Sequence, residues 1–137
     1  MIKFIVLGKP IGKGRPKFSM RGSFPIVYTP KNTVDYETLI KLEAKKYKPK
    51  TLLLGAIVLK LNIFFPILKS MNKQMAKMAR ELVLRPTKKP DVSNILKCVE
   101  DALNLIIWHD DSQIVEEHIY KYYSDNPRVE IEIDELS

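Results

Sequence analysis

Runs of apolar residues and their alternation with polar ones predict several β-strands. Residues Ile2–Leu7 are mostly β-branched or aromatic and end at Gly8, which is typical of a strand. Gly55–Phe65 is the most hydrophobic run and predicts a central strand buried on at least one face. Near the C-terminus apolar and charged residues alternate, which predicts a strand with one inward face. Its inward residues are Val129, Ile131 and Ile133, and two further strands are predicted at Phe24–Tyr28 and Ile114–Tyr123.

Two segments in the first two thirds of the chain carry helix signals. Thr29-Pro30 supplies an N-cap and a proline at the first helical position, and the helix is expected to reach about Tyr47. Ser70 is expected to cap a second helix whose apolar residues recur on one face. These residues are Met71, Met75, Met78 and Leu82. Ordinary core is their expected role, in preference to a binding surface.

A third helix is predicted over Ser93–Leu103, with one apolar and one polar face. The apolar face consists of Ile95, Leu96, Val99, Ala102 and Leu103. The polar face consists of Ser93, Asn94, Lys97, Glu100, Asp101 and Asn104. Asn104 can close the helix in the left-handed conformation. Cys98, at the edge of the apolar face, is expected to be a small buried residue.

The order of these elements predicts an α+β fold. Strands and helices interleave without strict βαβ repetition, so we expect helices packed on a mixed β-sheet. With 137 residues, 45% of them hydrophobic, residues 1–137 are expected to form a single domain with a substantial core. A lone cysteine excludes an intramolecular disulfide framework and favours a reducing, cytoplasmic setting. The apolar runs are too short or too interrupted to predict a secretion signal or a membrane span.

Charge is distributed unevenly along the chain. Residues 1–97 contain 21 basic and 5 acidic residues, a net charge of +16, whereas residues 98–137 contain 2 basic and 11 acidic residues, a net charge of −9. A strongly basic region favours a polyanionic partner such as nucleic acid, because bound phosphates release counterions. The alternative is that the two regions neutralise each other within the fold or across a dimer interface.

Two basic segments are candidates for contacts with DNA phosphates. Lys9–Gly22 contains three glycines and two prolines and is expected to be a mobile basic loop. Arg85–Pro90 is a second basic loop, bounded by prolines. The candidate DNA-binding residues are Lys9, Lys13, Arg15, Lys17, Arg21, Arg85, Lys88 and Lys89.

Three aspartates and one lysine are candidates for chemistry. Asp91 precedes the polar helix, and Asp110 and Asp111 follow it. Carboxylate oxygens are the ligands that Mg²⁺ prefers, and magnesium commonly assists phosphodiester hydrolysis. Lys97 could neutralise charge that develops on the scissile phosphate. The chain is long enough to bring Asp111 back beside the start of the helix, although a site completed across a dimer is equally allowed.

Each of these residues also has an ordinary structural interpretation. Asp91 could simply cap the helix, and Asp110-Asp111 could be a solvated turn. Lys97 could be a surface residue that pairs with Glu100 or Asp101. The two histidines, His109 and His118, lie at no diagnostic spacing from a nucleophile, so structural or surface roles are expected for them.

Several strings of residues together resemble the RusA family of Holliday junction resolvases. The strings are Lys89-Pro90-Asp91-Val92-Ser93-Asn94-Ile95-Leu96-Lys97, Asp101-Ala102-Leu103-Asn104, Asp110-Asp111-Ser112-Gln113-Ile114, Gly12-Lys13-Gly14-Arg15-Pro16 and Tyr28-Thr29-Pro30. The resemblance spans nearly the whole chain. It implies a small, dimeric, Mg²⁺-dependent endonuclease, often phage or prophage encoded, that cuts four-way DNA junctions in recombination and repair.

The resemblance also implies roles for individual residues. Asp91 and Asp111 match the catalytic, metal-binding aspartates of the family, and Lys97 matches its catalytic lysine. Asp110 is the neighbouring acid of the same motif. Ser93 stands where the family usually has a second aspartate, and a neutral hydroxyl is a poorer magnesium ligand. Glu100, Asp101 or Asp110 could compensate for it.

Two functions other than a junction-cutting enzyme remain open from the sequence. The first is a structure-selective DNA-binding protein that retains the RusA fold but has lost an acidic ligand at Ser93. The second is a domain that binds a protein partner through its acidic C-terminal region.

Overall fold

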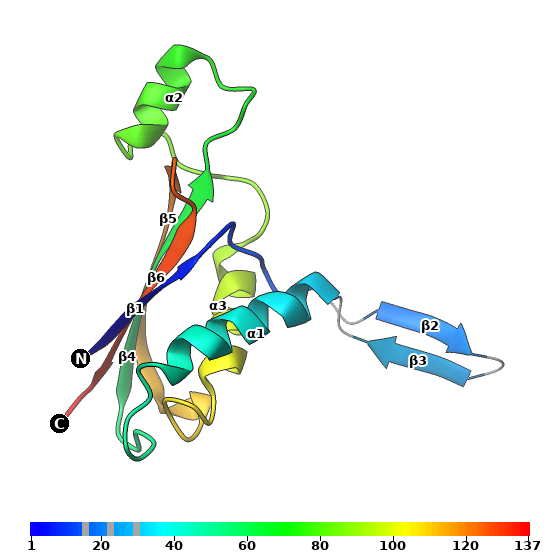
Figure 1. The fold of residues 1–137 in the computed structure, drawn as a ribbon, viewed down its shortest axis with the longest axis vertical. Coiled ribbons are helices and arrows are strands. Elements are labelled where there is room, and N and C mark those ends of the chain that lie inside the picture. Colours follow the sequence, from blue (N-terminus) through cyan, green and yellow to red (C-terminus); the bar gives the residue numbers. More distant parts are fainter. Residues whose placement is uncertain (15–16, 22–23, 29–30) are drawn as a thin grey trace.

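The computed structural model describes residues 1–14, 17–21, 24–28 and 31–137, the side chains at 17–21, 24–28 and 32–34 excepted. Within this part of the chain six strands and three α-helices follow in a mixed order (Figure 1). The strands are β1 (Ile2–Leu7), β2 (Lys17–Arg21), β3 (Phe24–Tyr28), β4 (Ile57–Pro66), β5 (Ile114–Ser124) and β6 (Arg128–Glu135). The helices are α1 (Lys31–Lys45), α2 (Lys73–Arg80) and α3 (Val92–Leu103), with a short 3₁₀ turn, η1, at Asp111–Gln113.

Four strands form one mixed sheet in the order β1-β6-β4-β5. β6 runs antiparallel to both β1 and β4, whereas β4 and β5 are parallel, so the expected mixed sheet is confirmed. Parallel strands need a long crossover, and α2, α3 and η1 all lie in the connection between β4 and β5. Gly8, with φ of +108°, turns the chain away from the end of β1.

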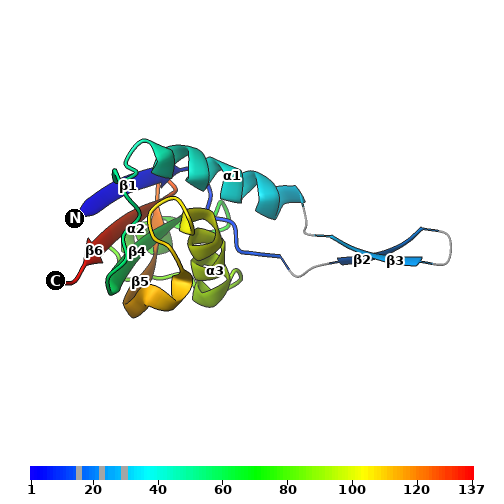
Figure 2. The same ribbon diagram turned by 90° about the horizontal axis from the view of Figure 1, so that it is seen from below.

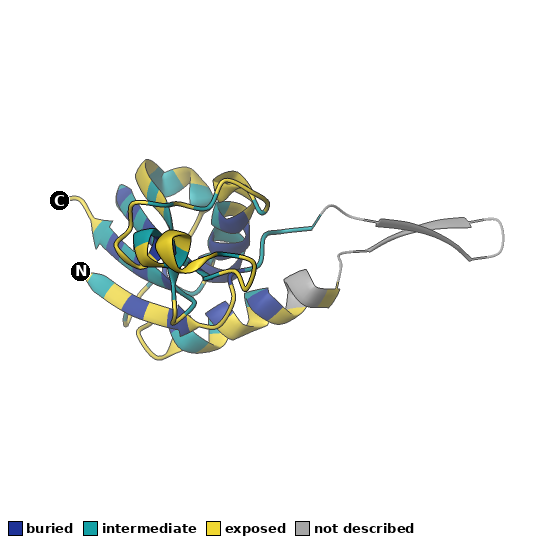
Figure 3. Cartoon of the chain, turned by 90° about the horizontal axis from the view of Figure 1, so that it is seen from above, coloured by how far each residue is buried: buried dark blue, intermediate teal, exposed yellow. Residues whose placement is uncertain are grey.

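Helices α1 and α3 pack against each other and cover one face of the sheet (Figure 2). Alternate residues of β4 point into this core, from Ile57 to Phe65, and are buried. Val129, Ile131 and Ile133 of β6 are buried on the same face, as predicted. The apolar face of α3 is buried as predicted except for Leu96, which is partly buried, and Cys98 is fully buried. Figure 3 shows the buried positions gathered between α3 and the strands.

Helix α2 departs from the sequence prediction in its start and in its environment. Its N-cap is Asn72, whose Oδ1 accepts a hydrogen bond from the Met75 backbone at 2.8 Å, and not Ser70. Met75 is 41% exposed and Leu82 is 45% exposed, whereas Met71 and Met78 are partly buried and Met71 packs against the core, so the expectation that the methionine stripe is core holds only in part. The position of α2 in the fold explains the exposure of Met75. An eight-residue helix at the end of the sheet contacts β5 and buries Ala79, and it has no second layer to cover its stripe (Figure 1).

Two local predictions also need correction. Asn104 ends α3 with φ of −58° and ψ of 130°, and Leu105, with φ of 64°, takes the left-handed conformation instead. Leu105 does so because its N–H donates to the Trp108 carbonyl at 2.8 Å in the turn that follows. The basic segment Lys9–Gly22 is not all loop, since Lys17–Arg21 forms β2 and pairs with β3 in a separate two-stranded sheet. No helix in the described part of the chain is long and apolar enough to cross a membrane.

Candidate functional site

Asp91 lies at the start of α3 without using its side chain as a cap. Its backbone is extended, with φ of −67° and ψ of 153°, and its carbonyl accepts from the N–H of Asn94 at 3.1 Å. Its exposed carboxylate makes no capping hydrogen bond. Asp91 therefore occupies the N-cap position, as its structural interpretation predicted, but its carboxylate does not cap the helix.

The N-terminal loop packs directly on this end of α3. The Lys13 N–H donates to the Asn94 carbonyl at 2.9 Å. A Cβ on Gly12 would lie 2.6 Å from the Pro90 Cβ, so the close approach requires glycine here. The two segments enclose a cavity of about 450 Å³, termed here the Asp91 cavity. It is lined by Gly12, Lys13, Gly14, Lys89, Pro90, Asp91 and Asn94.

Lys13 also connects the loop to the polar face of α3. Its ammonium pairs with Asp101 and lies 3.3 Å from Glu37 of α1, and hydrogen bonding to Asp101 raises its pKa. Lys97 pairs with the same carboxylate at 3.1 Å, as the structural interpretation of Lys97 predicted. Burial would raise the pKa of Asp101, but hydrogen bonds from the two lysines lower it below its usual value. Asp101 is therefore an ionised bridge between the two lysines.

Lys97 remains accessible despite this pair, since its side chain is 57% exposed. Hydrogen bonding to Asp101 raises its pKa, and the negative charges of Asp111 and Glu100 contribute in the same direction. The ammonium is thus charged at neutral pH and lies in the electrostatic field of Asp111. The fold therefore brings together two candidate residues that are 14 positions apart in the sequence.

The Asp111 carboxylate is hydrogen-bonded to a side chain of the hydrophobic core. Its Oδ1 accepts a hydrogen bond at 2.8 Å from the indole Nε1 of Trp108, which is fully buried. Such a bond to a charged acceptor is stronger than a neutral one and orients the carboxylate. Sequence analysis gave Trp108 no role. The available signal was a tryptophan three residues before an aspartate, because a buried indole N–H needs an acceptor.

Gln113 fixes the turn that carries the two aspartates. Its side-chain oxygen accepts from the N–H groups of His109 at 2.9 Å and Asp110 at 2.7 Å. Its side-chain nitrogen donates to the carbonyls of Leu53 at 2.8 Å and Gly55 at 3.0 Å, just before β4. All its hydrogen-bonding groups are therefore used to attach the turn to the sheet, which explains a glutamine two residues after Asp111.

Asp110 is more exposed and is engaged locally. Its carboxylate accepts from the Ser112 hydroxyl at 2.6 Å, and this hydrogen bond lowers the pKa of Asp110. His109 is exposed, and His118 is exposed and pairs with Glu116 at 2.6 Å. Burial raises the pKa of Cys98 to about 12, so this thiol is protonated at neutral pH and is not a nucleophile.

Glu100 joins Asp111 in an acidic patch that also includes Glu117 of β5. Burial and, after it, the charges of Glu117 and Asp111 raise the pKa of Glu100 to about 7, while Lys97 opposes them. Carboxylates that repel one another in this way favour a bound cation. From the sequence Glu100 was only a residue that could compensate for Ser93. Glu117 was missed because its approach to Glu100 depends on how β5 packs beside α3, which no local pattern shows.

The carboxylate oxygens near Asp111 are the type of ligand that binds a magnesium ion. Among the described residues, no group of three or more Asp, Glu, His or Cys side chains is arranged to hold one metal ion. Magnesium in nucleic-acid enzymes is usually bound by one or two carboxylates together with water and substrate phosphates, so a smaller set of oxygen ligands is sufficient. The structure places Asp111 beside Lys97 and Glu100, and it places Asp91 in a cavity whose lining does not include Asp111.

The second basic loop is attached to the end of β5. The Lys121 ammonium donates to the carbonyls of Lys88 at 2.8 Å and Pro90 at 3.0 Å. The guanidinium of Arg85 donates to the Lys121 carbonyl at 2.9 Å and lies 4.5 Å from the Tyr122 ring centre. The side chains of Lys88 and Lys89 are exposed, as is that of Lys9. Arg15 and the side chains of Lys17 and Arg21 lie outside the described residues.

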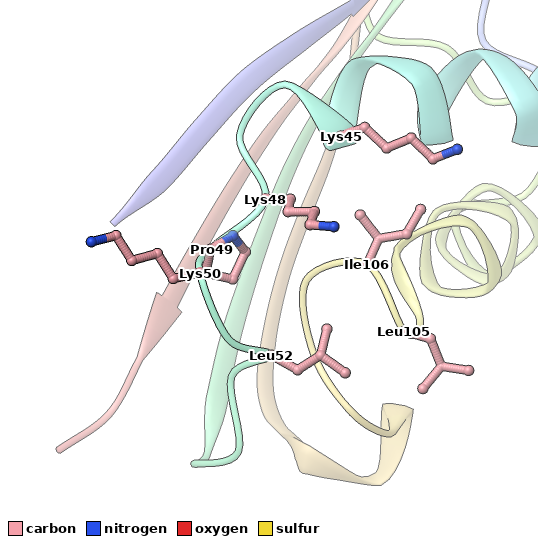
Figure 4. Close-up of a pocket in the computed structure, with 7 residues that line it drawn as sticks. All are labelled: Lys45, Lys48, Pro49, Lys50, Leu52, Leu105 and Ile106. Atoms are coloured by element: carbon pink, nitrogen blue, oxygen red, sulfur yellow. The ribbon is translucent and has the colours of Figure 1, made fainter.

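A further basic hollow was not foreseen from the sequence. It has a volume of about 600 Å³ and lies between the end of α1 and the turn after α3 (Figure 4). Lys45, Lys48 and Lys50 line it together with Leu105 and Ile106, and in Figure 4 the Lys50 side chain points away from these two apolar residues. Among the described residues no acidic side chain lines it, so it adds to the positive surface.

The chain is similar to known proteins over nearly its whole length. The family model described as endodeoxyribonuclease RusA matches residues 8–134. The chain is also 38% identical over 138 residues to the uncharacterized protein YqaN of Bacillus subtilis (strain 168). That alignment covers 99% of this chain and 97% of YqaN.

Proposed function

Because the chain belongs to the RusA endodeoxyribonuclease family, we propose that it is a Mg²⁺-dependent nuclease that cuts four-way DNA junctions. The family supports a nuclease that acts on branched DNA in recombination. Magnesium dependence, a homodimeric state and the roles of individual residues are the parts that the proposal adds.

One observation carries the proposal: the negative charge of Asp111 in η1 acts on the Lys97 ammonium of α3 and helps to raise the pKa of Lys97. A cation beside a carboxylate is the pairing that phosphodiester hydrolysis needs, because the carboxylate holds metal and the cation stabilises charge on the phosphate.

The proposed ligands of the metal are Asp111 and Asp91, with Asp110 as the neighbouring acid. Magnesium bound there would polarise the scissile phosphate and help to activate water. Lys97, charged and 57% exposed, would neutralise the charge that develops on the phosphate oxygens. Asp101 would keep Lys97 protonated and oriented, because the two side chains form an ion pair at 3.1 Å.

The proposed DNA contacts come from the two basic segments. Lys9, Lys88 and Lys89 are exposed beside the Asp91 cavity or line it, so they can reach phosphates near the proposed cleavage site. Arg15, Lys17, Arg21 and Arg85 remain proposed contacts from the sequence. Lys13 is expected to act mainly through its ion pairs with Asp101 and Glu37, which hold the loop in place. A two-fold symmetric dimer would present two such sites to the two strands that must be cut.

A second candidate function is junction binding without cleavage. Ser93 is exposed on the first turn of α3, and its hydroxyl cannot supply the negative charge that an aspartate would. The acidic patch around Glu100 favours the enzyme, because it places other carboxylates near Asp111.

A cleavage assay distinguishes the two candidates. Purified protein is incubated with a mobile four-way junction, with and without Mg²⁺, beside a Ser93→Asp variant. Symmetric nicks by the natural sequence, dependent on Mg²⁺, are expected. Tight binding without nicks, with cleavage restored in Ser93→Asp, would instead establish a junction-binding protein that lacks one carboxylate.

A further inference from the structure

A second cavity, of about 230 Å³, adjoins the Asp91 cavity. It lies where β4 and β5 end, and its walls are mainly apolar: Phe65, Pro66, Leu68, Pro86, Pro90 and Tyr123. Lys89 and Pro90 line both cavities, so the two share a wall. A group held in the second cavity therefore lies next to the proposed cleavage site.

The rim of this cavity is basic. Lys9, Lys88 and Lys89 contribute to its lining, and no acidic residue in the described part of the chain does. All three lysines are exposed. An apolar interior with a cationic rim is complementary to a flat, largely apolar group attached to phosphates, and a nucleotide has this chemistry.

The cavity is held open by the structure around it. Lys121 fixes the carbonyls of Lys88 and Pro90, and its ammonium lies 5.3 Å from the Phe65 ring centre. The loop that forms one wall is therefore attached to β5 and Phe65 of β4 at several points. A preformed site loses less conformational entropy when a ligand binds.

The volume of this second cavity limits the size of the ligand that it can hold. Pockets for drug-sized molecules have volumes of about 300–1,000 Å³, and this cavity is smaller. The volume suits one ring system and not a folded segment of protein. We infer that the cavity lined by Phe65, Leu68, Pro86 and Tyr123 receives a single unstacked nucleobase of the branched DNA, next to the phosphate that is cut.

This inference rests on the proposed function and names a subsite for its substrate. Bases at the centre of a four-way junction lose a stacking neighbour more easily than bases within a duplex, so moving one into a pocket costs less there. The lysine rim would hold the flanking phosphates, while the apolar walls would replace the lost base stacking.

Filling the cavity tests the inference. Leu68 is 43% exposed, so Leu68→Trp and Leu68→Glu should both fold, the first reducing the space and the second placing a carboxylate against it. Leu136→Trp is the matched control, because Leu136 is 50% exposed and lies beyond the end of β6, outside the lining of this cavity. Binding is measured without Mg²⁺ on a four-way junction and on junctions with one abasic nucleotide, moved in turn through the positions that flank the branch.

Both Leu68 variants should bind the intact junction more weakly, on the order of tenfold for loss of one stacked base, or about 1.4 kcal/mol. On the junction whose critical nucleotide is abasic, wild type and both variants should bind equally. The base pocket would be overturned if the Leu68 variants bound every abasic junction more weakly than wild type by the same factor. It would also be overturned if they bound the intact junction as tightly as wild type. Neither result would contradict junction binding itself. If wild type binds the junction no more tightly than a duplex, the proposed function itself fails and the inference fails with it.

Discussion

The indole Nε1 of Trp108 donates a hydrogen bond to Oδ1 of Asp111 at 2.8 Å, and so joins the hydrophobic core to the acidic patch. Trp108 is fully buried, and its N–H has no access to water. The carboxylate therefore satisfies a buried donor, and the indole in return restricts the carboxylate to one orientation. Asp111 thus has a structural and a proposed catalytic role at the same position.

Trp108→Phe removes the indole donor while retaining a buried aromatic ring. We expect the free energy of unfolding to fall by about 2 kcal/mol, because a hydrogen bond to a charged group is lost and the core is underfilled. The measurement is urea unfolding of Trp108→Phe, Asp111→Asn and the double variant. If Trp108 acts through Asp111, Trp108→Phe should lower the free energy of unfolding by less in the Asp111→Asn background than in wild type. Equal costs in both backgrounds would show that the two residues are energetically independent.

Asp111→Asn should abolish junction cleavage and leave junction binding within about threefold of wild type, since the amide keeps the shape but not the charge of a metal ligand. Cleavage and gel-shift binding are measured on the same DNA. Asp125→Asn is the matched control, because it also removes one negative charge but lies on the exposed turn after β5, paired with Arg80 at 2.7 Å. Retained cleavage by Asp111→Asn would remove this residue from the proposed site.

Lys89→Ala should weaken junction binding and reduce its dependence on salt. Each lost phosphate contact lowers the slope of log K against log salt concentration by about one unit. The affinity is measured at several salt concentrations for Lys89→Ala and for Lys73→Ala, an exposed lysine at the start of α2. An unchanged slope for Lys89→Ala would argue that its ammonium does not contact a phosphate.

Lys13→Ala should act mainly on the fold of the N-terminal loop. Its ammonium is paired with Asp101 and Glu37, so we expect unfolding to become easier by about 1 kcal/mol. Lys9→Ala is the control, since Lys9 is exposed. Thermal unfolding compares the two variants, and hydrogen exchange of the Lys13 amide reports whether its bond to Asn94 opens. Equal stability of the two variants would contradict the anchoring role.

Glu100 should make stability depend on pH. Its pKa is raised from 4.5 to about 7 by burial and by nearby carboxylates, so the folded state binds this proton more tightly than the unfolded state does. The stabilisation by the protonated form is complete below about pH 4.5 and is lost as the pH rises through about 7. Glu100→Gln should therefore have a higher Tm than wild type at about pH 8, and the difference should shrink toward about pH 5.

The matched control for this pH series is Glu81→Gln, which changes an exposed glutamate that follows α2. Its difference from wild type should stay small. A difference for Glu100→Gln that is constant from about pH 5 to pH 8 would show that Glu100 titrates as an ordinary surface carboxyl.

The sequence by itself determined most of the elements and the identity of the candidate residues. Apolar runs located β1 and β4, alternation located β6, and helical periodicity located the buried face of α3, because each of these patterns is a local property of its own segment. The spacing of Asp91, Lys97 and Asp111 was visible for the same reason, since a motif is a local property of the chain. The methionine stripe has an equally clear pattern, yet Met75 and Leu82 are exposed, because a pattern does not say whether another layer exists to cover it.

Only the tertiary structure decided which residues meet. Lys13 pairs with Asp101 across 88 positions of sequence, Gln113 reaches back to Leu53 and Gly55, and β6 inserts between β1 and β4. Such contacts depend on how the chain crosses over the sheet and are not encoded in the periodicity of any one segment. The packing of the turn after α3 decides that Asp111 acts on Lys97 and Glu100, whereas Asp91 lines a cavity formed with the N-terminal loop, so the layout of the site depends on tertiary packing as well as on helical spacing.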